Sequence, residues 1–396
     1  MNMNKLIITR VIPAIRMLTS VDQIMSVRFD NRSEFLTIEN GEDLAKLSFV
    51  KKSDSILVVD ETKDPQEIIE DLEVKLSTWT ETRSIHPDYI LLKGIGLVAI
   101  APDVASLDHL FGAEEVPVTK LSGRVQDKIV IVTGGAQGFG GGIAELLYTQ
   151  GANVVIADLN VEVGQKLVSM LNAKNQTNKA WFVKVNVVDP ESVEEMVSET
   201  VKHFGGLDAI ISNAGILRAG SLDEMTPEVF SLMTDVNYNG YFLCAKYASA
   251  VMKVQSQFRK DYFMDIIQIN SKSGLKGSNK NFAYAGGKFG GIGLTQSFAM
   301  ELMPHHIKVN SICPGNFFEG PLWSDPEKGL FVQYLKAGKV PGAKDIEDVK
   351  AFYEAQVPAG RGCRVIDVVR AILYVMEQEY ETGQAVPVTG GQNMLN

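Results

Sequence analysis

The sequence predicts an α/β protein in which a doubly wound parallel sheet follows a smaller α/β domain. From residue 128 onward, short apolar runs rich in β-branched residues alternate with helical segments. That alternation is the pattern of repeated βαβ units, which form a parallel sheet with helices on both faces. A glycine-rich turn after the first run, at 129–133, supports the same prediction. The chain has 396 residues, and we divide it into domains at 1–120 and 121–396.

Composition and charge narrow the class of protein. Apolar residues make up 45% and charged residues 22% of the chain, as in ordinary globular proteins. The net charge of −10 argues against a nucleic-acid binder. No apolar run reaches about 18 residues, so we expect neither a membrane span nor a signal peptide, with a transit peptide as the alternative. Three widely spaced cysteines indicate a reducing compartment, the cytoplasm, and five histidines without metal-site spacing predict no metal.

The first 120 residues contain signals for both strands and helices. Asp64-Pro65-Gln66-Glu67 opens a helix, because Asp caps its end, Pro suits its first position and Glu comes three residues after the cap. The segment 89–100 predicts two strands around a Lys-Gly turn. The elements expected here are a strand at 5–11, a strand at 55–60, a helix at 64–78, two strands within 89–100, a helix at 103–111 and a linker at 112–123.

The later elements succeed one another in βα order. Because parallel strands present their carboxyl ends at one edge of the sheet, residues just after these strands are expected to share a site. The expected strands are 129–133, 153–157, 181–185, 207–211, 265–269, 307–312 and 385–388, and the expected helices are 143–150, 190–204, 225–257, 282–303 and 365–378.

The glycine-rich turn predicts a Rossmann-type dinucleotide site. Gly134, Gly138 and Gly140 have the spacing G-x-x-x-G-x-G, between a strand and a helix. Glycines let the backbone approach a pyrophosphate, and the helix N-terminus supplies N–H donors. Gln137 and Phe139 lie in the same turn. Glycine turns are common in proteins, so the weight of this motif depends on the residues at the ends of the later strands.

Asp158 ends the second strand of this series, eighteen residues after Gly140. A carboxylate there can accept hydrogen bonds from the adenosine ribose, and it would repel the 2′-phosphate of NADP. No Lys or Arg stands at Gln137, Leu159 or Asn160 to neutralise such a phosphate. The expected cofactor is therefore NAD, with a simple helix cap as the alternative role for Asp158.

The stretch from Ser271 to Lys288 carries the strongest catalytic signal. Tyr284 and Lys288 are four residues apart, so on a helix they share a face, and Ser271 stands thirteen residues before the tyrosine. A nearby ammonium favours the phenolate and lowers the tyrosine pKa, which suits proton transfer near neutral pH. The alternative is a surface loop followed by an ordinary helix.

These motifs, in this order, resemble those of the short-chain dehydrogenase/reductase family over residues 126–396. The resemblance implies that Tyr284 is the general acid/base, that Ser271 binds the reacting oxygen, and that Lys288 lowers the tyrosine pKa and holds the nicotinamide ribose. It also implies that Asn237 supports a water-linked proton path to Lys288. Beside Tyr284, Lys288, Asp158 and the turn, the implied cofactor-binding residues are Asn186, Val187, Asn213, Ala214, Gly215, Pro314 and Gly315.

Stretches at 266–274, 288–297, 361–363 and 388–392 resemble bacterial sorbitol-6-phosphate 2-dehydrogenases, which implies oxidation of a sugar-alcohol phosphate. Three lysines follow Ser271 in a stretch that contains no Asp or Glu. A bound phosphate needs charge-assisted hydrogen-bond donors of this kind. The alternatives are solvated loop lysines, an unphosphorylated polyol or ketone as substrate, and a non-catalytic NAD-binding sensor. The three lysines are Lys272, Lys276 and Lys280, and the expected substrate residues are Ser271, Lys272, Ser273, Lys276 and Arg361.

Several parts depart from the family pattern. The residues after Pro314-Gly315 lack the threonine that in the family often holds the nicotinamide amide. The long segment 317–360 is either a lid over the substrate or a segment whose aromatic residues only pack in the core. The segment 88–103 weakly resembles the strand pair of class II aldolase domains, yet histidines for a metal are too few, so we expect a structural or regulatory domain. Five glycines in the helix 282–303 require close packing. In the family this helix lines a subunit interface, which implies a homodimer or homotetramer.

Overall fold

The computed structural model describes residues 3–50, 55–60, 64–83, 85–114, 117–120, 122–277, 279–327, 329–336, 338 and 340–394. The N-terminal part holds a four-stranded sheet in the order β1-β4-β3-β2. Strands β3 and β4 form the expected antiparallel hairpin. The strands are β1 (Ser26–Asp30), β2 (Ile56–Val59), β3 (Tyr89–Leu92) and β4 (Gly96–Ala101), and the helices beside them are α3 (Ser33–Leu36), α4 (Gly41–Leu44), α5 (Pro65–Arg83) and α6 (Val104–Leu110).

The strand expected at 5–11 is wrong, because this segment is helical. Helix α1 (Met3–Leu6), a π-helical turn (Ile7–Val11) and α2 (Ile12–Thr19) run on without a break. Ile7, Ile8 and Val11 are buried at helical spacing, and nearly every residue of α2 is buried. The run of isoleucines suits a strand locally, but packing against three other helices favours the helical period.

The C-terminal part is a seven-stranded parallel sheet in the order β11-β10-β9-β8-β5-β6-β7. The order reverses beside β5, where β6 lies on one side and β8 on the other, and ligands of such sheets bind at this switch point. All seven expected strands are present, shifted by at most a few residues. They are β5 (Ile129–Thr133), β6 (Asn153–Asp158), β7 (Ala180–Lys184), β8 (Ala209–Ser212), β9 (Met264–Ile269), β10 (Ile307–Pro314) and β11 (Ala385–Val388).

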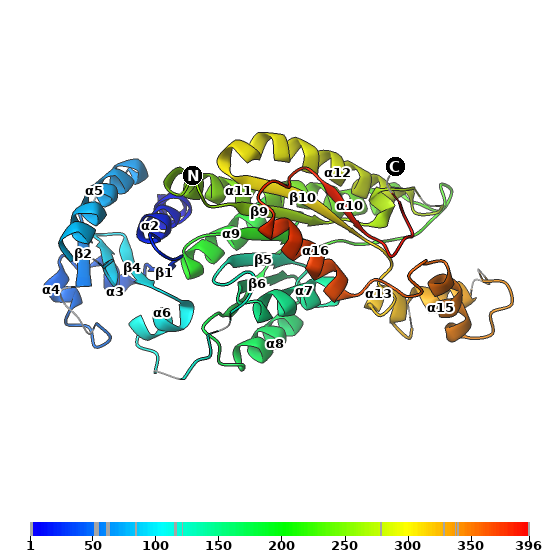
Figure 1. The fold of residues 1–396 in the computed structure, drawn as a ribbon, viewed down its shortest axis with the longest axis horizontal. Helices are drawn as coiled ribbons and strands as arrows, with labels where there is room; N and C mark the ends of the chain where they lie inside the picture. The colour runs from blue at the N-terminus through cyan, green and yellow to red at the C-terminus, as the bar shows by residue number, and fades with distance from the viewer. Residues whose placement is uncertain are drawn as a thin grey trace.

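Helices cover both faces of this sheet (Figure 1). Helices α7, α8 and α16 pack on one face, and α9, α11 and α12 pack on the other. The expected helix at 225–257 consists of α10, a π-helical turn at Asp235–Asn239 and α11. The bounds are α7 (Gly138–Thr149), α8 (Val161–Asn172), α9 (Pro190–Phe204), α10 (Pro227–Thr234), α11 (Gly240–Phe258), α12 (Phe282–Leu302) and α16 (Val365–Glu377).

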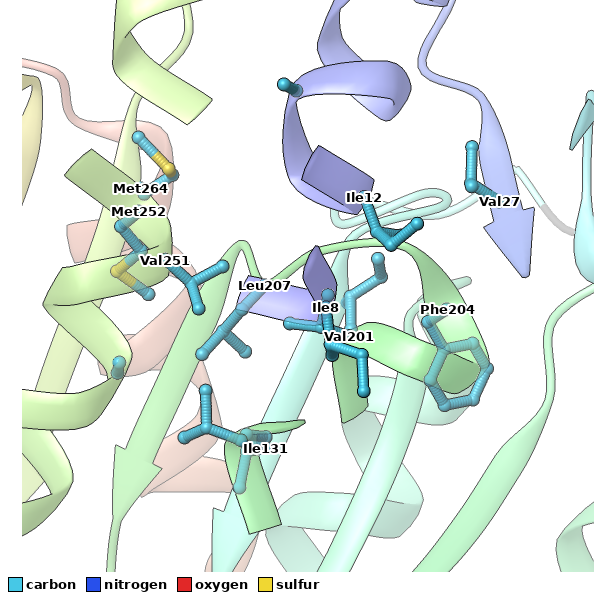
Figure 2. Close-up of a cluster of buried hydrophobic side chains, with 14 of the residues drawn as sticks. Ile8, Ile12, Val27, Ile131, Val201, Phe204, Leu207, Val251, Met252 and Met264 are labelled. Carbon is cyan, nitrogen blue, oxygen red and sulfur yellow. The ribbon is translucent and has the colours of Figure 1, made fainter. Parts of the chain in front are cut away.

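The helical segment 3–19 joins the two parts through one hydrophobic core. Figure 2 shows Ile8 and Ile12 beside Val201, Phe204 and Leu207, all of which belong to one buried cluster. A buried ion pair accompanies this packing. The Arg16 guanidinium donates two bonds of 2.8 Å to the Asp208 carboxylate at the amino end of β8, and both side chains are fully buried. The segment 3–19 therefore packs against the parallel-sheet part as well as against the four-stranded sheet.

The segment between β10 and α16 forms a small lobe at the opposite end of the molecule from the four-stranded sheet (Figure 1). It contains α13 (Pro321–Ser324), α14 (Leu330–Lys336) and α15 (Ile346–Ala355). Its own apolar cluster centres on Trp323 and Phe331, with ring centroids 5.1 Å apart. We call residues 317–360 the insert lobe.

Among the described residues, no helix is both long and apolar enough to cross a bilayer. The same residues contain no group of three or more His, Cys, Asp or Glu side chains that could hold a metal ion. Cys244, Cys313 and Cys363 are unpaired.

Candidate active site

A cleft of about 960 Å³ lies at the carboxyl end of the parallel sheet. Loops after β5, β6, β8, β9 and β10 line it together with the insert lobe, so the sheet edge gathers motifs that are far apart in sequence. Nearly all of the residues predicted from the sequence meet here. They are Gly134, Gln137, Gly138, Phe139, Gly140, Asp158, Asn186, Val187, Asn213, Ala214, Gly215, Ser271, Lys272, Ser273, Lys276, Tyr284, Lys288, Pro314 and Gly315.

The glycine turn has the geometry that a pyrophosphate site needs. Gly134 and Gly138 both have φ of +61°, which favours glycine. A Cβ at Gly140 would lie 2.0 Å from the Gly134 carbonyl oxygen, so only glycine permits this close turn. Asn213 holds the turn to β8, because its Nδ2 donates to the carbonyl oxygens of Thr133 at 3.0 Å and Gly134 at 3.2 Å. A Cβ at Gly138 would meet nothing within 4 Å, which leaves the N-terminus of α7 open toward the cleft.

Asp158 lies in the cleft at the end of β6 and also supports the turn. Its Oδ2 accepts from the Ala136 N–H at 3.0 Å and its Oδ1 from the Asn160 N–H at 2.9 Å. The cap of α8 is Asn160, so the alternative that Asp158 is a simple helix cap is wrong. Each carboxylate oxygen can accept a further bond, so its support of the turn and a ribose-binding role are compatible. With the glycine turn, this donor and acceptor set fits a dinucleotide.

Ser271, Tyr284 and Lys288 meet between the end of β9 and the start of α12. The Lys288 Nζ lies 5.5 Å from the centre of the Tyr284 ring and donates to the Ile269 carbonyl oxygen at 2.8 Å. The Ser271 Oγ accepts from the Ser273 N–H at 3.1 Å, and its hydroxyl lies near Tyr284, where it lowers the pKa of the phenol. This is the arrangement expected for a proton-transfer set.

Burial changes the acidity of both groups. It raises the pKa of Tyr284 to about 12, and the hydrogen bond with Ser271 opposes this only in part. Burial also lowers the pKa of Lys288 to about 8. The sequence predicts that the nearby Lys288 ammonium lowers the tyrosine pKa, but burial raises the pKa of Tyr284 instead. The loss of water around the phenol outweighs the neighbouring groups.

Asn237 does not line the cleft but lies directly behind it. It belongs to the π-helical turn between α10 and α11, a feature often found at functional sites. Its Oδ1 accepts from the Ile216 N–H at 3.2 Å, and its Nδ2 donates to the Ile216 carbonyl oxygen at 2.9 Å. A Cβ at Gly215 would lie 2.8 Å from this Oδ1 and 3.8 Å from the Lys288 Nζ. Asn237 and Lys288 thus approach each other across Gly215.

Cations line the outer part of the cleft. Lys272, Lys276 and Lys280 contribute to its wall, and Arg218 from the loop after β8 joins them. Burial lowers the pKa of Lys272, so this ammonium is poorly solvated and would gain from an anionic partner.

Arg361 is not among the residues that line the cleft. Its guanidinium donates to the Asp367 carboxylate at 2.6 and 3.0 Å, in the first turn of α16. Asp367 also accepts from the Arg364 N–H at 3.0 Å, so this pair closes the start of the helix. The expectation that Arg361 contacts substrate is wrong in this structure, because the guanidinium is bound by the carboxylate of Asp367, six residues later.

Sequence reasoning missed several residues in the cleft. Gln392 and Asn393 come from the C-terminal segment, and the Asn393 Nδ2 donates to the Lys272 carbonyl oxygen at 3.3 Å. Both come after β11, so the rule that sites form after parallel strands could have found them. The insert lobe adds the rings of Trp323, Tyr334 and Tyr353 to the wall.

A stacked aromatic pair links the insert lobe to the glycine turn. The rings of Phe139 and Phe317 lie 4.2 Å apart at an interplanar angle of 19°, and both line the cleft. Phe139 comes after Gly138 at the start of α7, whereas Phe317 opens the insert lobe.

The fold and this site define a class of oxidoreductase. A family model for short chain dehydrogenases matches residues 128–323. The chain is also 33% identical over 272 residues to the sorbitol-6-phosphate 2-dehydrogenase of Escherichia coli (strain K12), covering 68% of this chain and all of that enzyme. The chain therefore belongs to the short-chain dehydrogenase family, whose members typically use NAD or NADP.

Other similar proteins act on different alcohols or are known by structure. The trans-4-hydroxycyclohexanecarboxylate dehydrogenase of Sinomonas cyclohexanicum is 31% identical over 285 residues, covering 70% of this chain and 98% of its own. The crystal structure of a sorbitol-6-phosphate 2-dehydrogenase from Erwinia amylovora superposes with a TM-score of 0.61 at 35% identity, covering 67% of this chain and all of that one. These matches leave about a third of the present chain without a counterpart.

Proposed function

We propose that the chain is an NAD-dependent dehydrogenase that reversibly oxidises a secondary alcohol of a sugar-alcohol phosphate, of the sorbitol 6-phosphate to fructose 6-phosphate type. The carrying observation is that one cleft combines a dinucleotide turn, the Ser271–Tyr284–Lys288 set and a group of cations. A sensor that only binds NAD would need no proton-transfer group, so the full set favours an enzyme over a sensor.

In this proposal Tyr284 accepts the proton of the substrate hydroxyl, and the Ser271 side chain beside it orients the reacting oxygen. The Lys288 ammonium, 5.5 Å from the ring, favours the phenolate that forms. Asn237 supports the proton path behind Gly215, where its side chain approaches Lys288. When bound, the nicotinamide cofactor takes up the hydride.

The substrate phosphate is assigned to the lysines of the loop after Ser271, with Lys272 and Lys276 as its principal partners and Ser273 beside them. The support is that both lysines line the cleft and that burial lowers the pKa of Lys272. A phosphate dianion would satisfy these donors with charge-assisted hydrogen bonds. The position of Arg361 outside the cleft wall removes it from this role.

The assignment is tested by comparing sorbitol 6-phosphate with sorbitol as substrates, with NADH monitored by absorbance. Lys272→Met should lower kcat/KM for the phosphorylated substrate by about 10-fold or more, as expected for the loss of about 1.5–3 kcal/mol of charged hydrogen bonding. Its kcat/KM for the unphosphorylated polyol should change little. Lys260→Met, at an exposed residue outside the cleft wall, serves as the matched control. Equal kcat/KM values of the wild-type enzyme for the two substrates would show that the site does not recognise a substrate phosphate.

An unphosphorylated polyol or a ketone is the second candidate substrate. The rings of Trp323, Tyr334 and Tyr353 in the cleft wall favour a carbon skeleton with an apolar face. The Sinomonas relative is named for a cyclic hydroxy acid, which shows that similar sequences serve such alcohols. A panel that adds cyclic alcohols separates this candidate from the first.

Four further proposals accompany this function. NAD is preferred to NADP because Asp158 stands where a 2′-phosphate would lie and Leu159 comes next to it in the cleft. A homodimer or homotetramer is supported by exposed apolar residues on α11 and α12, among them Phe242, Phe289 and Met300. We place the enzyme in the cytoplasm on its unpaired cysteines. Residues 1–120 are proposed to form a structural or regulatory domain.

A further inference from the structure

A chain of buried side chains connects the back of α12 to the catalytic segment. The Tyr241 hydroxyl lies 3.0 Å from the Thr295 Oγ1, which lies 2.7 Å from the Ser311 Oγ. The Ser311 hydroxyl donates to the Gln268 Oε1 at 3.0 Å, and the Asn270 Nδ2 donates to the same oxygen at 2.7 Å. All five side chains are at most 4% exposed, so each must find its partners inside the protein.

The backbone groups that this hydrogen-bonded network contacts determine how its two side-chain amides are oriented. The Ser271 N–H can only donate, so the atom it reaches at 2.8 Å must be the Asn270 Oδ1. The Asn270 Nδ2 then faces the Lys288 carbonyl oxygen, which can only accept, at 2.8 Å. Because this Nδ2 also donates to Gln268, the atom of Gln268 that accepts must be its Oε1. No alternative flip of Asn270 satisfies both backbone groups.

Asn270 therefore ties together two backbones that carry different members of the catalytic set. One is the strand end that presents Ser271, and the other is the turn of α12 that presents Lys288. Two glycines leave the space that these amides occupy. A Cβ at Gly274 would lie 2.1 Å from the Asn270 Oδ1, and a Cβ at Gly291 would lie 2.4 Å from the Gln268 Nε2. The close packing that the glycines of α12 require is thus met in part by a side chain of the same protomer, Gln268.

We propose that Asn270, held in place by Gln268, is a positioning residue that sets the separation between Ser271 and the Tyr284–Lys288 turn. This inference rests on the proposed dehydrogenase function. Asn270 bonds backbone atoms on both sides and does not take part in proton transfer. Without it, the Lys288 Nζ bond to the Ile269 carbonyl oxygen would still join α12 to this strand end, but the backbone of α12 would lose its bond to Asn270. Displacements below 1 Å in such a set reduce turnover.

The first test is Asn270→Ala, assayed with whichever alcohol the wild-type enzyme oxidises. We expect kcat to fall by about 10- to 100-fold, while the dissociation constant for NADH changes less than about twofold because the glycine turn is untouched. Asn178→Ala is the matched control, since Asn178 is equally buried and its Nδ2 also bonds two carbonyl oxygens, those of Tyr148 at 2.9 Å and Ala152 at 2.7 Å. The control should lose similar thermal stability but keep kcat within about twofold.

The second test is Asn270→Asp, which keeps the shape and remains informative if the alanine variant fails to fold. Its neutral carboxyl can still donate to the Lys288 carbonyl oxygen, whereas its ionised form cannot. Burial raises the pKa of such a carboxyl. We therefore expect the ratio of its kcat to that of wild type to fall about 10-fold or more between pH 5.5 and pH 8.5.

Three results would overturn the inference: a wild-type kcat in Asn270→Ala, an equal loss in Asn178→Ala, or a kcat ratio for Asn270→Asp that does not depend on pH. A wild-type enzyme that turns over no alcohol would instead reject the proposed function, and the inference with it. The two failures are therefore distinguished by the wild-type assay alone.

Discussion

At the scale of single residues, the cleft holds charged and polar groups that cost stability. Lys288 is 4% exposed, with a pKa of about 8, and Lys272 is also desolvated. A cation in such surroundings gives up hydration that one hydrogen bond to the Ile269 carbonyl oxygen replaces only in part. Such a residue is retained for its chemistry, which predicts opposite effects of its removal on activity and on stability.

Tyr284→Phe removes the proton-transfer group and leaves the ring in place. We expect turnover to fall by about 10²- to 10⁴-fold, the range typical of a lost general acid/base. The fold and NADH binding should persist, as measured by circular dichroism and by NADH fluorescence. Near-wild-type turnover in a folded, NADH-binding variant would show that the assignment of Tyr284 is wrong.

Lys288→Met should abolish most turnover and yet stabilise the protein at neutral pH. A base whose folded pKa is lowered, here to about 8, costs stability below that pH, and the cost vanishes as the pH rises to the unfolded value near 10.5. We expect the variant to gain about 1–3 kcal/mol of unfolding free energy at pH 7 and almost nothing near pH 10. Thermal unfolding at both pH values checks this, and a difference that is independent of pH would contradict it.

At the scale of elements, the insert lobe and the glycine turn meet through one aromatic stack. Phe317 opens the lobe and stacks on Phe139 at 4.2 Å, while the lobe keeps a separate apolar cluster around Trp323. A lobe with its own core can move as a unit, and the stack is a contact that such a movement would break. We expect it to help retain the cofactor.

Phe317→Ala should therefore weaken NADH binding. An offset stack contributes about 0.5–1.5 kcal/mol, which corresponds to a rise of about 2- to 12-fold in the dissociation constant. Faster NADH release in stopped-flow fluorescence would accompany it. Phe352→Ala is the control, because this half-exposed ring packs on Tyr353 within the same lobe and does not line the cleft. Equal effects of the two substitutions on NADH binding would show that the Phe139–Phe317 stack does not help to retain the cofactor.

At the scale of the whole molecule, the N-terminal part is joined to the catalytic half by a buried charge pair and a shared core. Burial alone would raise the pKa of Asp208, but Arg16 holds that pKa below its usual range. The Asp208 Oδ2 also accepts from the Ile129 N–H at 2.8 Å, at the start of β5. The pair thus links α2 to two central strands, and residues 3–19 cannot be removed without exposing it.

Arg16→Met should destabilise the protein by about 3–5 kcal/mol, because it leaves the Asp208 carboxylate buried and uncompensated. Arg124→Met is the matched control, since the partly exposed pair between Arg124 and Glu377 should contribute no more than about 1 kcal/mol. Urea unfolding measures both. A chain truncated to begin at residue 121 should aggregate, because it exposes the apolar face that α2 covers. A stable, monodisperse truncation would show that the two parts are independent.

The sequence by itself determined the parallel sheet and most of the motifs that meet in its cleft. Strands buried on both faces read as continuous apolar runs, and site residues come directly after such strands, so the glycine turn, Asp158 and the Ser271–Lys288 stretch could be located from local pattern alone. The same rule, applied after β11, would also have reached Gln392 and Asn393.

Only the tertiary structure decided the features that depend on distant partners. The segment 5–11 is a helix because α5, α9 and α11 bury one side of it. Arg361 is unavailable to substrate because Asp367 binds it. The pKa of Tyr284 rises because the folded chain excludes water around it, whatever its neighbours in sequence. Asn270 gains its proposed role from a contact with Lys288, eighteen residues away. Burial and pairing are properties of the packed chain, and a local pattern does not contain them.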